Sequence, residues 1–212
     1  MYLSQLLLNP RSRQVQREIA DPYEMHRTLM RAFPSKEEGG PSRVLFRVDT
    51  GRNDGMIRVL VQSEVQPDWS WCVGDGSRDY LLPHVSPNPQ WKRWEPAFRV
   101  GQVLMFRLRA NPTVKRNGKR FGLYRHAEQM DWLGRKAREG GFEVLTVVAR
   151  PEGMARSYQK REDGRQTMQW FSVQFDGVLR VCDEGLFAEA IRCGIGSGKG
   201  LGFGLLSVAR YA

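Results

Sequence analysis

The sequence predicts an α+β protein made of two tandem ferredoxin-like (βαββαβ), RRM-like domains. Three observations lead to this fold class. Strand and helix patterns in residues 102–209 follow the order βαββαβ, which defines the split-βαβ unit. Residues 1–64 repeat the opening βαββ part of that order. The 212 residues suffice for two such domains, each with a core of its own.

The first half begins with an apolar stretch at residues 1–9 that predicts a strand. A capped, helix-periodic segment and two strands joined by the turn signal GRNDG follow, at residues 22–33, 43–50 and 56–64. Residues 66–97 then combine four tryptophans with five prolines. We expect this stretch to hold a degraded second helix, a short strand and the connection between the domains. The predicted domains are therefore residues 1–94 and 98–212.

The second half shows its elements more plainly. The expected elements are strand 102–110, a basic loop, helix 127–139, strand 142–150, a polar excursion, strand 167–182, helix 184–192 and strand 204–209. The strand at 167–182 is expected to break at Asp176-Gly177.

The charge balance makes nucleic acid the first partner to consider. Lys and Arg number 33 against 23 Asp and Glu, a formal net charge of +10. The alternative is a basic protein that binds no polyanion.

The three cysteines (Cys72, Cys182 and Cys193) form no C-x-x-C pair, which argues against a disulfide framework or a zinc site and suits a reducing cytosol. No apolar run approaches the roughly 20 residues of a membrane helix, and the opening MYLSQLLLNP lacks the basic region of a signal peptide.

The segment ADPYEMHRTLMRAF carries strong helix signals. Asp21 can cap the helix, Pro22 suits its first position, and Glu24 completes a capping-box pattern. At 100° per residue, the core face holds Met25, Leu29, Ala32 and Phe33. Tyr23 and His26 fall on an adjoining stripe at i, i+3 spacing, which makes their side chains neighbours.

This pair suits RNA cleavage without a metal. A histidine has a pKa near neutrality and can take the proton of a 2′-OH, while a tyrosine can donate to or orient the scissile phosphate. Arg27 and Arg31 lie just beyond and would disfavour the imidazolium, although RNA phosphates would act in the opposite direction. The alternative is that His26 is a surface residue and Tyr23 a packing residue. His84 and His126 lack a comparable setting. Acidic residues are scattered, so no metal and no other cofactor is predicted.

The segment GIGSGKGLGFGLL, residues 194–206, holds six glycines. A P-loop would need glycine at Cys193 and Ser or Thr at Gly200, and the dinucleotide fingerprint fails in every frame. The spacing fits two Gly-φ-Gly pairs around a basic spacer, with φ an apolar residue. Glycine would let backbone N–H groups approach an anionic backbone, with Ile195 and Phe203 as anchors. The alternative is a helix C-cap followed by a flexible turn. The predicted RNA-binding positions are Gly194, Gly196, Gly198, Lys199, Gly200, Gly202 and Gly204.

Two further basic segments are predicted to bind RNA. Residues 107–125 contain seven basic residues and no acidic one, and those chosen as contacts are Arg107, Arg109, Lys115, Arg116, Lys119 and Arg120. Alternation along a strand puts Arg107 and Arg109 on one face. The second segment, around the turn EDG, predicts a hairpin that carries Arg156, Lys160, Arg161 and Arg165. The alternative is that these charges are only solvated.

Taken together, these motifs resemble the CasE family, the CRISPR repeat endoribonucleases of type I-E Cascade, over nearly the whole chain. The segments that carry the resemblance are MYLS at the start, YEMHRTL with its Tyr-x-x-His, FRLRANPTVK at 106–115, AEQMDWL at 127–133 and GIGSGKGLGFGLLSVA at 194–209. The resemblance implies that Tyr23 and His26 are catalytic and that a hairpin contacts the repeat stem-loop. Position 31 is often a lysine in relatives, which leaves the role of Arg31 open, and Arg27 and Arg31 are taken as RNA-binding.

The resemblance further implies a metal-independent endoribonuclease that cuts CRISPR precursor RNA on the 3′ side of each repeat stem-loop. The expected products carry a 2′,3′-cyclic phosphate or 3′-phosphate and a 5′-hydroxyl. The protein would keep the crRNA, join the other Cascade subunits and be cytoplasmic. The main alternative is a non-catalytic RNA-binding subunit of the same architecture. A weaker one is a scaffold protein whose charge serves protein contacts.

Overall fold

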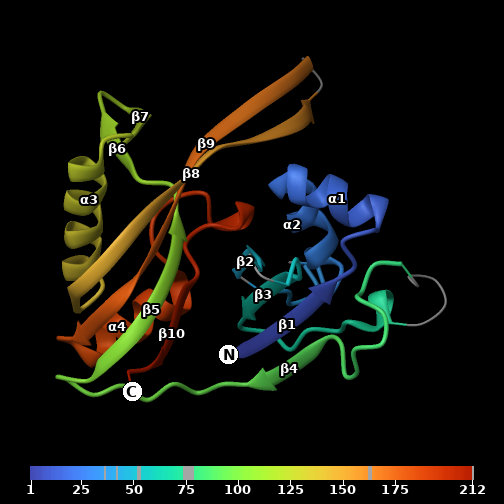
Figure 1. The fold of residues 1–212 in the computed structure, drawn as a ribbon, viewed down its shortest axis with the longest axis horizontal. Coiled ribbons are helices and arrows are strands. Elements are labelled where there is room, and N and C mark those ends of the chain that lie inside the picture. Colours follow the sequence, from blue (N-terminus) through green and yellow to red (C-terminus); the bar gives the residue numbers. More distant parts are fainter. Residues whose placement is uncertain (36, 42, 52–53, 74–78, 162–163, 212) are drawn as a thin grey trace. The chain divides into compact units, whose positions relative to one another are not determined.

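The computed structural model describes residues 1–35, 37–41, 43–51, 54–73, 79–161 and 164–211. The chain forms two compact units. The first comprises residues 1–95, 156–168 and 200–202, and the second residues 96–155, 169–199 and 203–212. Each unit combines helices with an antiparallel sheet, so the predicted α+β class of two tandem ferredoxin-like domains is confirmed (Figure 1).

The first unit has the strand order β2-β3-β1-β4, with every neighbouring pair antiparallel. Its elements are β1 (Tyr2–Leu8), α1 (Arg13–Ala20), α2 (Pro22–Met30), β2 (Val44–Thr50), β3 (Ile57–Ser63), the 3₁₀ turn η1 (Ser70–Cys72) and β4 (Gln90–Arg93). One 3₁₀ turn and one short strand occupy the tryptophan- and proline-rich stretch, as predicted. Helix α1 was not predicted, and α2 ends three residues before the predicted position.

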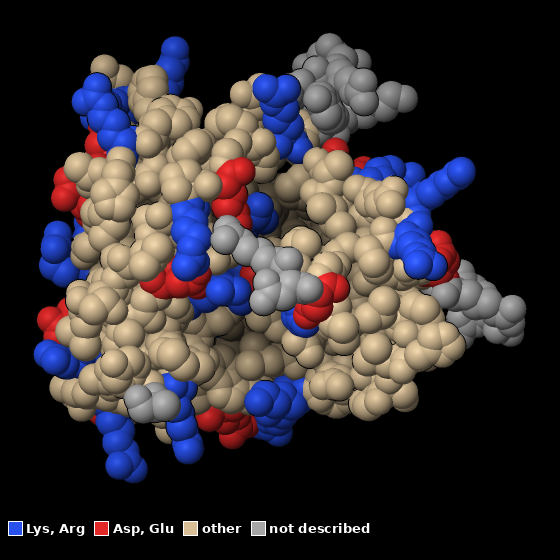
Figure 2. All heavy atoms as spheres, viewed as in Figure 1, with Lys and Arg blue, Asp and Glu red and all other residues tan. Residues whose placement is uncertain are grey.

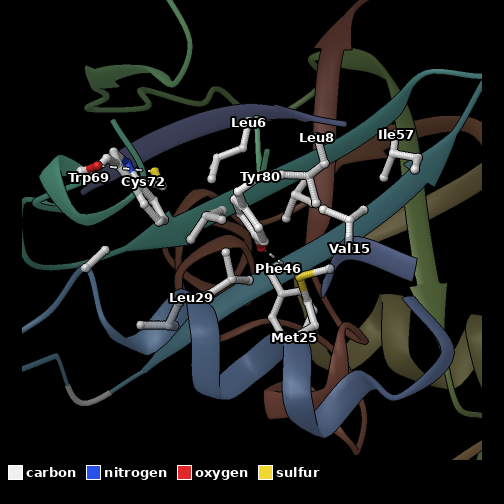
Figure 3. Close-up of a cluster of buried hydrophobic side chains, with 14 of the residues drawn as sticks. Leu6, Leu8, Val15, Met25, Leu29, Phe46, Ile57, Trp69, Cys72 and Tyr80 are labelled. Atoms are coloured by element: carbon white, nitrogen blue, oxygen red, sulfur yellow. Dashed lines mark hydrogen bonds between the residues drawn. The ribbon is translucent and has the colours of Figure 1, made fainter. Parts of the chain in front are cut away.

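The core of the first unit lies between α1, α2 and one face of the sheet. Leu6 and Leu8 of β1 and Met25 and Leu29 of α2 are all fully buried. Figure 3 shows Phe46 of β2 pointing into this cluster beside Met25. The face of α2 predicted to be buried is therefore buried, which fixes how the helix is rotated about its axis.

The sheet of the second unit has the order β10-β5-β9-β8. When the four strands of each sheet are numbered along the chain, both sheets have the order 4-1-3-2 from one edge to the other. Its elements are β5 (Val103–Ala110), β6 (Thr113–Arg116), β7 (Lys119–Gly122), α3 (His126–Glu139), β8 (Phe142–Arg161), β9 (Gly164–Val181), α4 (Glu184–Cys193), the 3₁₀ turn η3 (Lys199–Leu201, shared between the units) and β10 (Leu206–Arg210). Helices α3 and α4 lie on one face of the sheet (Figure 1). Trp132 of α3 stacks on Phe175 of β9 at 6.2 Å between ring centroids.

Two sequence predictions for this unit were wrong. The basic loop is a hairpin, β6–β7, whose turn places Asn117 and Gly118 at positive φ. The expected break at Asp176-Gly177 does not occur, because β9 runs through it. A Cβ at Gly177 would lie 2.0 Å from the backbone oxygen of Thr146 on β8. Glycine therefore serves a close approach between these two strands rather than a break.

Within the described residues, no helix is long and apolar enough to cross a membrane.

Candidate active site and nucleic-acid interface

Helix α2 is fixed at its first residue by a side-chain cap. The Asp21 carboxylate accepts a hydrogen bond from the backbone N–H of Tyr23 at 3.0 Å, and Pro22 occupies the first turn. Both were predicted. Glu24, predicted to complete a capping box, instead forms an ion pair with Arg27 at 3.2 Å on the helix surface.

The same cap also connects α2 to the long β8–β9 hairpin. Asp21 Oδ1 accepts a second hydrogen bond from the hydroxyl of Ser157, at 2.5 Å, and the Ser157 side chain is fully buried. Ser157 belongs to the segment of β8 that is part of the first unit. The distal hairpin is therefore attached to the start of the helix that carries Tyr23 and His26.

His26 is half-buried against an aromatic ring. Its imidazole stacks on Phe46 of β2, with ring centroids 6.3 Å apart and planes inclined by 16°. Its Nδ1 is buried and has no hydrogen-bond partner within the part of the chain that the structure describes. Burial lowers the pKa of His26 below its usual 6.5, because the charged imidazolium loses hydration. The imidazole is therefore favoured in its neutral form.

The two arginines proposed from the sequence to disfavour the imidazolium are placed differently. Arg27 pairs with Glu24, and the Arg31 guanidinium lies 4.5 Å from the centroid of the Trp71 ring. The sequence did not predict the net direction of the His26 pKa shift; the structure lowers this pKa, and the cause is burial rather than these charges.

Part of the glycine-rich segment lies against the histidine. A Cβ built on Gly200 would be 3.7 Å from His26 Cε1 and 3.8 Å from Nε2. A Cβ on Gly202 would be 3.1 Å from Cε2 of Phe46. Residues 200–202 belong to the same compact unit as α2 and β2. Sequence reasoning assigned these glycines to RNA and missed this contact, since no local pattern links residues 26, 46 and 200.

The other loop glycines lie close to the protein itself. A Cβ on Gly196 would meet the Trp132 ring at 2.9 Å, and one on Gly204 would meet the Ile195 carbonyl oxygen at 2.7 Å. Gly194 is the C-cap of α4, as the alternative reading of the loop proposed. The anchors Ile195 and Phe203 are buried. Internal packing thus accounts for the glycine content here, while contact with RNA by Gly194, Gly196, Gly198, Lys199, Gly200, Gly202 and Gly204 stays a prediction.

The two arginines on β5 share one face, as predicted, and both are paired within the second unit. Arg107 Nε lies 2.6 Å from Asp176 Oδ1 on β9. Arg109 Nε donates to Glu152 at 2.6 Å and to Ser172 at 3.0 Å, and its guanidinium lies 5.3 Å from the centroid of the Phe203 ring. Both arginines therefore form ion pairs between β5 and the other long strands of the second unit.

The β6–β7 hairpin presents its charges to solvent. Lys115, Arg116, Lys119 and Arg120 are all exposed. Phe121 beside them is 48% exposed, and a shallow hollow is lined by Arg116, Asn117, Lys119 and Phe121. Exposed cations next to an exposed aromatic ring are the combination that single-stranded nucleic acids favour.

Of the contacts predicted on the β8–β9 hairpin, Arg156 is the one whose side chain is described. Arg156 is exposed on β8, and the side chains of Lys160, Arg161 and Arg165 lie outside the described part of the structure. On the face shown in Figure 2, Lys and Arg side chains are scattered among other residues, with Asp and Glu side chains close to several of them. Among the described residues, no group of three or more His, Cys, Asp or Glu side chains could hold a metal ion.

A family model described as "CRISPR associated protein" matches residues 1–210. The chain belongs to this family. It is 40% identical to "CRISPR-associated endoribonuclease Cse3" of Thermus thermophilus, over 99% of this chain and all of the relative. It is 29% identical to "CRISPR system Cascade subunit CasE" of Escherichia coli K12, over 99% of both chains. The resemblance found in the sequence is thereby confirmed.

Comparison with solved structures also finds similarity to a CRISPR endoribonuclease. The solved structure of Cse3 bound to a 19-nucleotide RNA matches with a TM-score of 0.84 at 38% identity, over 99% of this chain and all of that one.

Proposed function

We propose that this protein is a metal-independent endoribonuclease that cuts CRISPR precursor RNA within each repeat, on the 3′ side of the stem-loop. It then retains the mature crRNA as a subunit of a Cascade complex and acts in the cytoplasm. The main support for this function is sequence similarity over 99% of the chain: 40% identity to a CRISPR-associated endoribonuclease and 29% identity to a Cascade subunit. The proposed domains are residues 1–94 and 98–212. The two compact units support this division, although residues 156–168 and 200–202 belong to the first unit.

One observation carries the proposed chemistry: the half-buried His26 imidazole, whose pKa burial lowers. A neutral imidazole near pH 7 can accept the proton of the ribose 2′-OH. Because Nδ1 is buried, Nε2 is the nitrogen proposed to take that proton. The resulting 2′-oxygen attacks the adjacent phosphorus and expels the 5′-oxygen, which leaves a 2′,3′-cyclic phosphate and a 5′-hydroxyl. The leaving 5′-oxygen takes up one proton as its bond to phosphorus breaks, which balances the proton that His26 removes, and no redox step is needed.

Tyr23 is the second proposed catalytic residue. It lies one turn before His26 on α2, and the Asp21 cap holds its backbone N–H. Its hydroxyl would donate to, or orient, the scissile phosphate. Arg27, Arg31 and the exposed cations of β6–β7 are proposed to hold the RNA backbone, together with the glycine-rich loop.

The alternative is a non-catalytic RNA-binding subunit, in which Tyr23 and His26 would be incidental. A cleavage assay on the host's own repeat RNA, labelled at its 5′ end, separates the two functions. Endonuclease activity predicts one cut per repeat and a product that ends in a cyclic or 3′-phosphate. A tight complex with uncut RNA would instead establish the binding subunit. Failure to bind the hairpin at all would favour a scaffold protein.

A further inference from the structure

The His26 imidazole is enclosed by groups from two segments that are distant in the sequence. Phe46 of β2 is buried, at 1% exposure, and its ring is nearly parallel to the imidazole. Gly200 contributes backbone on the same side chain, and Gly202 lies against the Phe46 ring. All four residues belong to one compact unit.

The distances place Gly200 over the face of the imidazole. A Cβ on Gly200 would lie 3.7 Å from Cε1, 3.8 Å from Nε2 and 3.9 Å from Nδ1. An approach in the ring plane toward Cε1 would leave both nitrogens clearly farther away than the carbon. Three nearly equal distances therefore mean an approach from above the plane. Gly200 therefore lies over the face of the imidazole, and the Phe46 ring lies nearly parallel to it.

We infer that Phe46 and Gly200 are positioning residues that form an apolar seat for the His26 imidazole. The seat fixes the plane of the ring and keeps water away from Nδ1. It also gives the glycine-rich loop a second role, because one segment of a predicted RNA-binding loop supports the catalytic side chain. This inference rests on the proposed function and names two residues that act through His26.

No charged side chain belongs to the seat, so none of its groups changes the pKa of His26 through its charge. On α2, Glu24 and Arg27 pair with each other, and the Arg31 guanidinium lies over the Trp71 ring. On β2, Arg47 and Asp49 pair with each other, and alternation puts their side chains on the strand face opposite Phe46. Residues 200–202 contain no titratable side chain. Burial is accordingly the cause of the lowered pKa of His26.

The two glycines differ in how they tolerate a methyl group, which provides a clean probe. At Gly200 a Cβ would make ordinary van der Waals contact with the imidazole, and its φ does not require glycine. At Gly202 the φ of +81° strains any other residue, and a Cβ would press on Phe46. Gly200→Ala therefore adds one methyl group above His26 without disturbing the backbone.

The test is an NMR titration of the full-length protein, in which only three histidines contribute imidazole signals (His26, His84 and His126). The His26→Gln variant assigns the His26 signal. In the wild type, His26 is expected to titrate below 6.5. Phe46→Leu should raise its pKa toward 6.5, because the stacked ring no longer excludes water. Gly200→Ala should leave its pKa lowered, or lower it further, and should shift the His26 signal itself.

Cleavage provides the second readout. The rate at saturating RNA should fall as pH drops through the pKa of His26, because the protonated imidazole cannot accept a proton. Phe46→Leu should move that fall to higher pH by the same amount as in the titration, with RNA affinity within about twofold of wild type. A merely structural role for Phe46 would lower stability but leave the pH profile in place.

Two control variants match the test variants. Ile57→Val removes one methylene from the same buried cluster. Ile57 lies on β3 four residues from Val61, which pairs with Phe46, so Ile57 is about 13 Å along the strand from that pair. Gly134→Ala adds a methyl group on α3, where a Cβ would approach only the Arg138 side chain, at 3.9 Å. Neither should alter the His26 titration.

Each outcome decides a separate question. An unchanged His26 pKa in folded Phe46→Leu, or an equal shift in Ile57→Val, would overturn the seat. If Phe46→Leu does not fold, a His26 signal in Gly200→Ala that matches the one in Gly134→Ala would overturn it. If the titrations behave as expected but wild type never cuts RNA, the seat stands and the proposed endonuclease function fails.

Discussion

The α2 site and the β6–β7 hairpin use polar residues in opposite ways. At α2, one histidine is held against an aromatic ring and loses hydration, which lowers its pKa. On the hairpin, four cations are exposed beside an exposed phenylalanine. Proton transfer benefits from a desolvated and fixed group, whereas capture of a polyanion benefits from accessible charge. Substitutions at the two places should therefore separate the rate of cleavage from the affinity for RNA.

The largest separation is expected at the histidine. His26→Ala should slow cleavage at saturating RNA by about 10²- to 10⁴-fold, the usual loss when a general base is removed. The dissociation constant should change little, because the base contributes no net charge to binding. Single-turnover kinetics and a filter-binding assay measure the two quantities. A collapse of binding in His26→Ala would make His26 a structural residue.

The hairpin should show the converse behaviour. Replacement of Lys115, Arg116, Lys119 and Arg120 by glutamine should weaken binding by roughly 10²- to 10³-fold near 0.1 M salt and reduce the salt slope by about one per lost phosphate contact. The rate at saturating RNA should stay within about threefold. Neutralisation of Arg135, Lys136, Arg180 and Arg192, which pair with Glu139, Glu143 and Glu189, removes the same number of charges and is the matched control. Equal losses in the control would mean that net charge alone, and not this hairpin, binds the RNA.

A smaller effect is expected for the arginines of β5, which the charge count of the sequence could not distinguish from those of the hairpin. Arg109→Gln leaves Glu152 and Ser172 without their cation and should lower the free energy of unfolding by about 1–2 kcal/mol. Lys115→Gln, on the exposed hairpin, should change it by less than about 0.5 kcal/mol. Urea denaturation compares the two variants, and similar values would show that the Arg109 ion pair adds no stability.

The smallest effect is expected where the β8–β9 hairpin meets α2. Ser157→Ala removes the hydrogen bond to the Asp21 cap and should cost about 0.5–1.5 kcal/mol of stability. Because this cap begins the helix of Tyr23 and His26, the cleavage rate should also fall severalfold at unchanged affinity. Ser157→Thr keeps the hydroxyl and should restore both. If Ser157→Thr also lost cleavage rate, the hydrogen bond of the hydroxyl would not be the cause of the slower cleavage in Ser157→Ala.

Local patterns in the sequence were sufficient for most of the fold. Alternating apolar residues predicted the strands of both sheets, and the Asp21–Pro22 signal predicted the start and the buried face of α2. Helix α1 escaped prediction because its buried face consists of Val15 and Glu18. Glu18 is a carboxylate satisfied by Thr28 and Tyr80, and no apolar periodicity marks it.

The site was only partly predictable, for a physical reason. Residue type and i, i+3 spacing single out Tyr23 and His26. The desolvation that lowers the pKa of His26 comes from Phe46 and Gly200, which only the tertiary fold brings near it. Likewise, the ion pairs of Arg107 and Arg109 depend on Asp176 and Glu152 of the neighbouring strands. Charge can be counted in a sequence, but its availability for a ligand cannot.

The most direct measurement of the central claim is single-turnover cleavage of the host repeat RNA in excess EDTA, with a 2′-deoxy substitution at the cut site as the paired substrate. Wild type is expected to cut the all-ribose RNA once per repeat in EDTA and to bind the deoxy RNA with the same affinity but leave it intact, whereas His26→Ala should cut neither at an appreciable rate. Cleavage of the deoxy RNA, or cleavage abolished by EDTA and restored by a divalent cation, would contradict attack by the 2′-OH with His26 as its base.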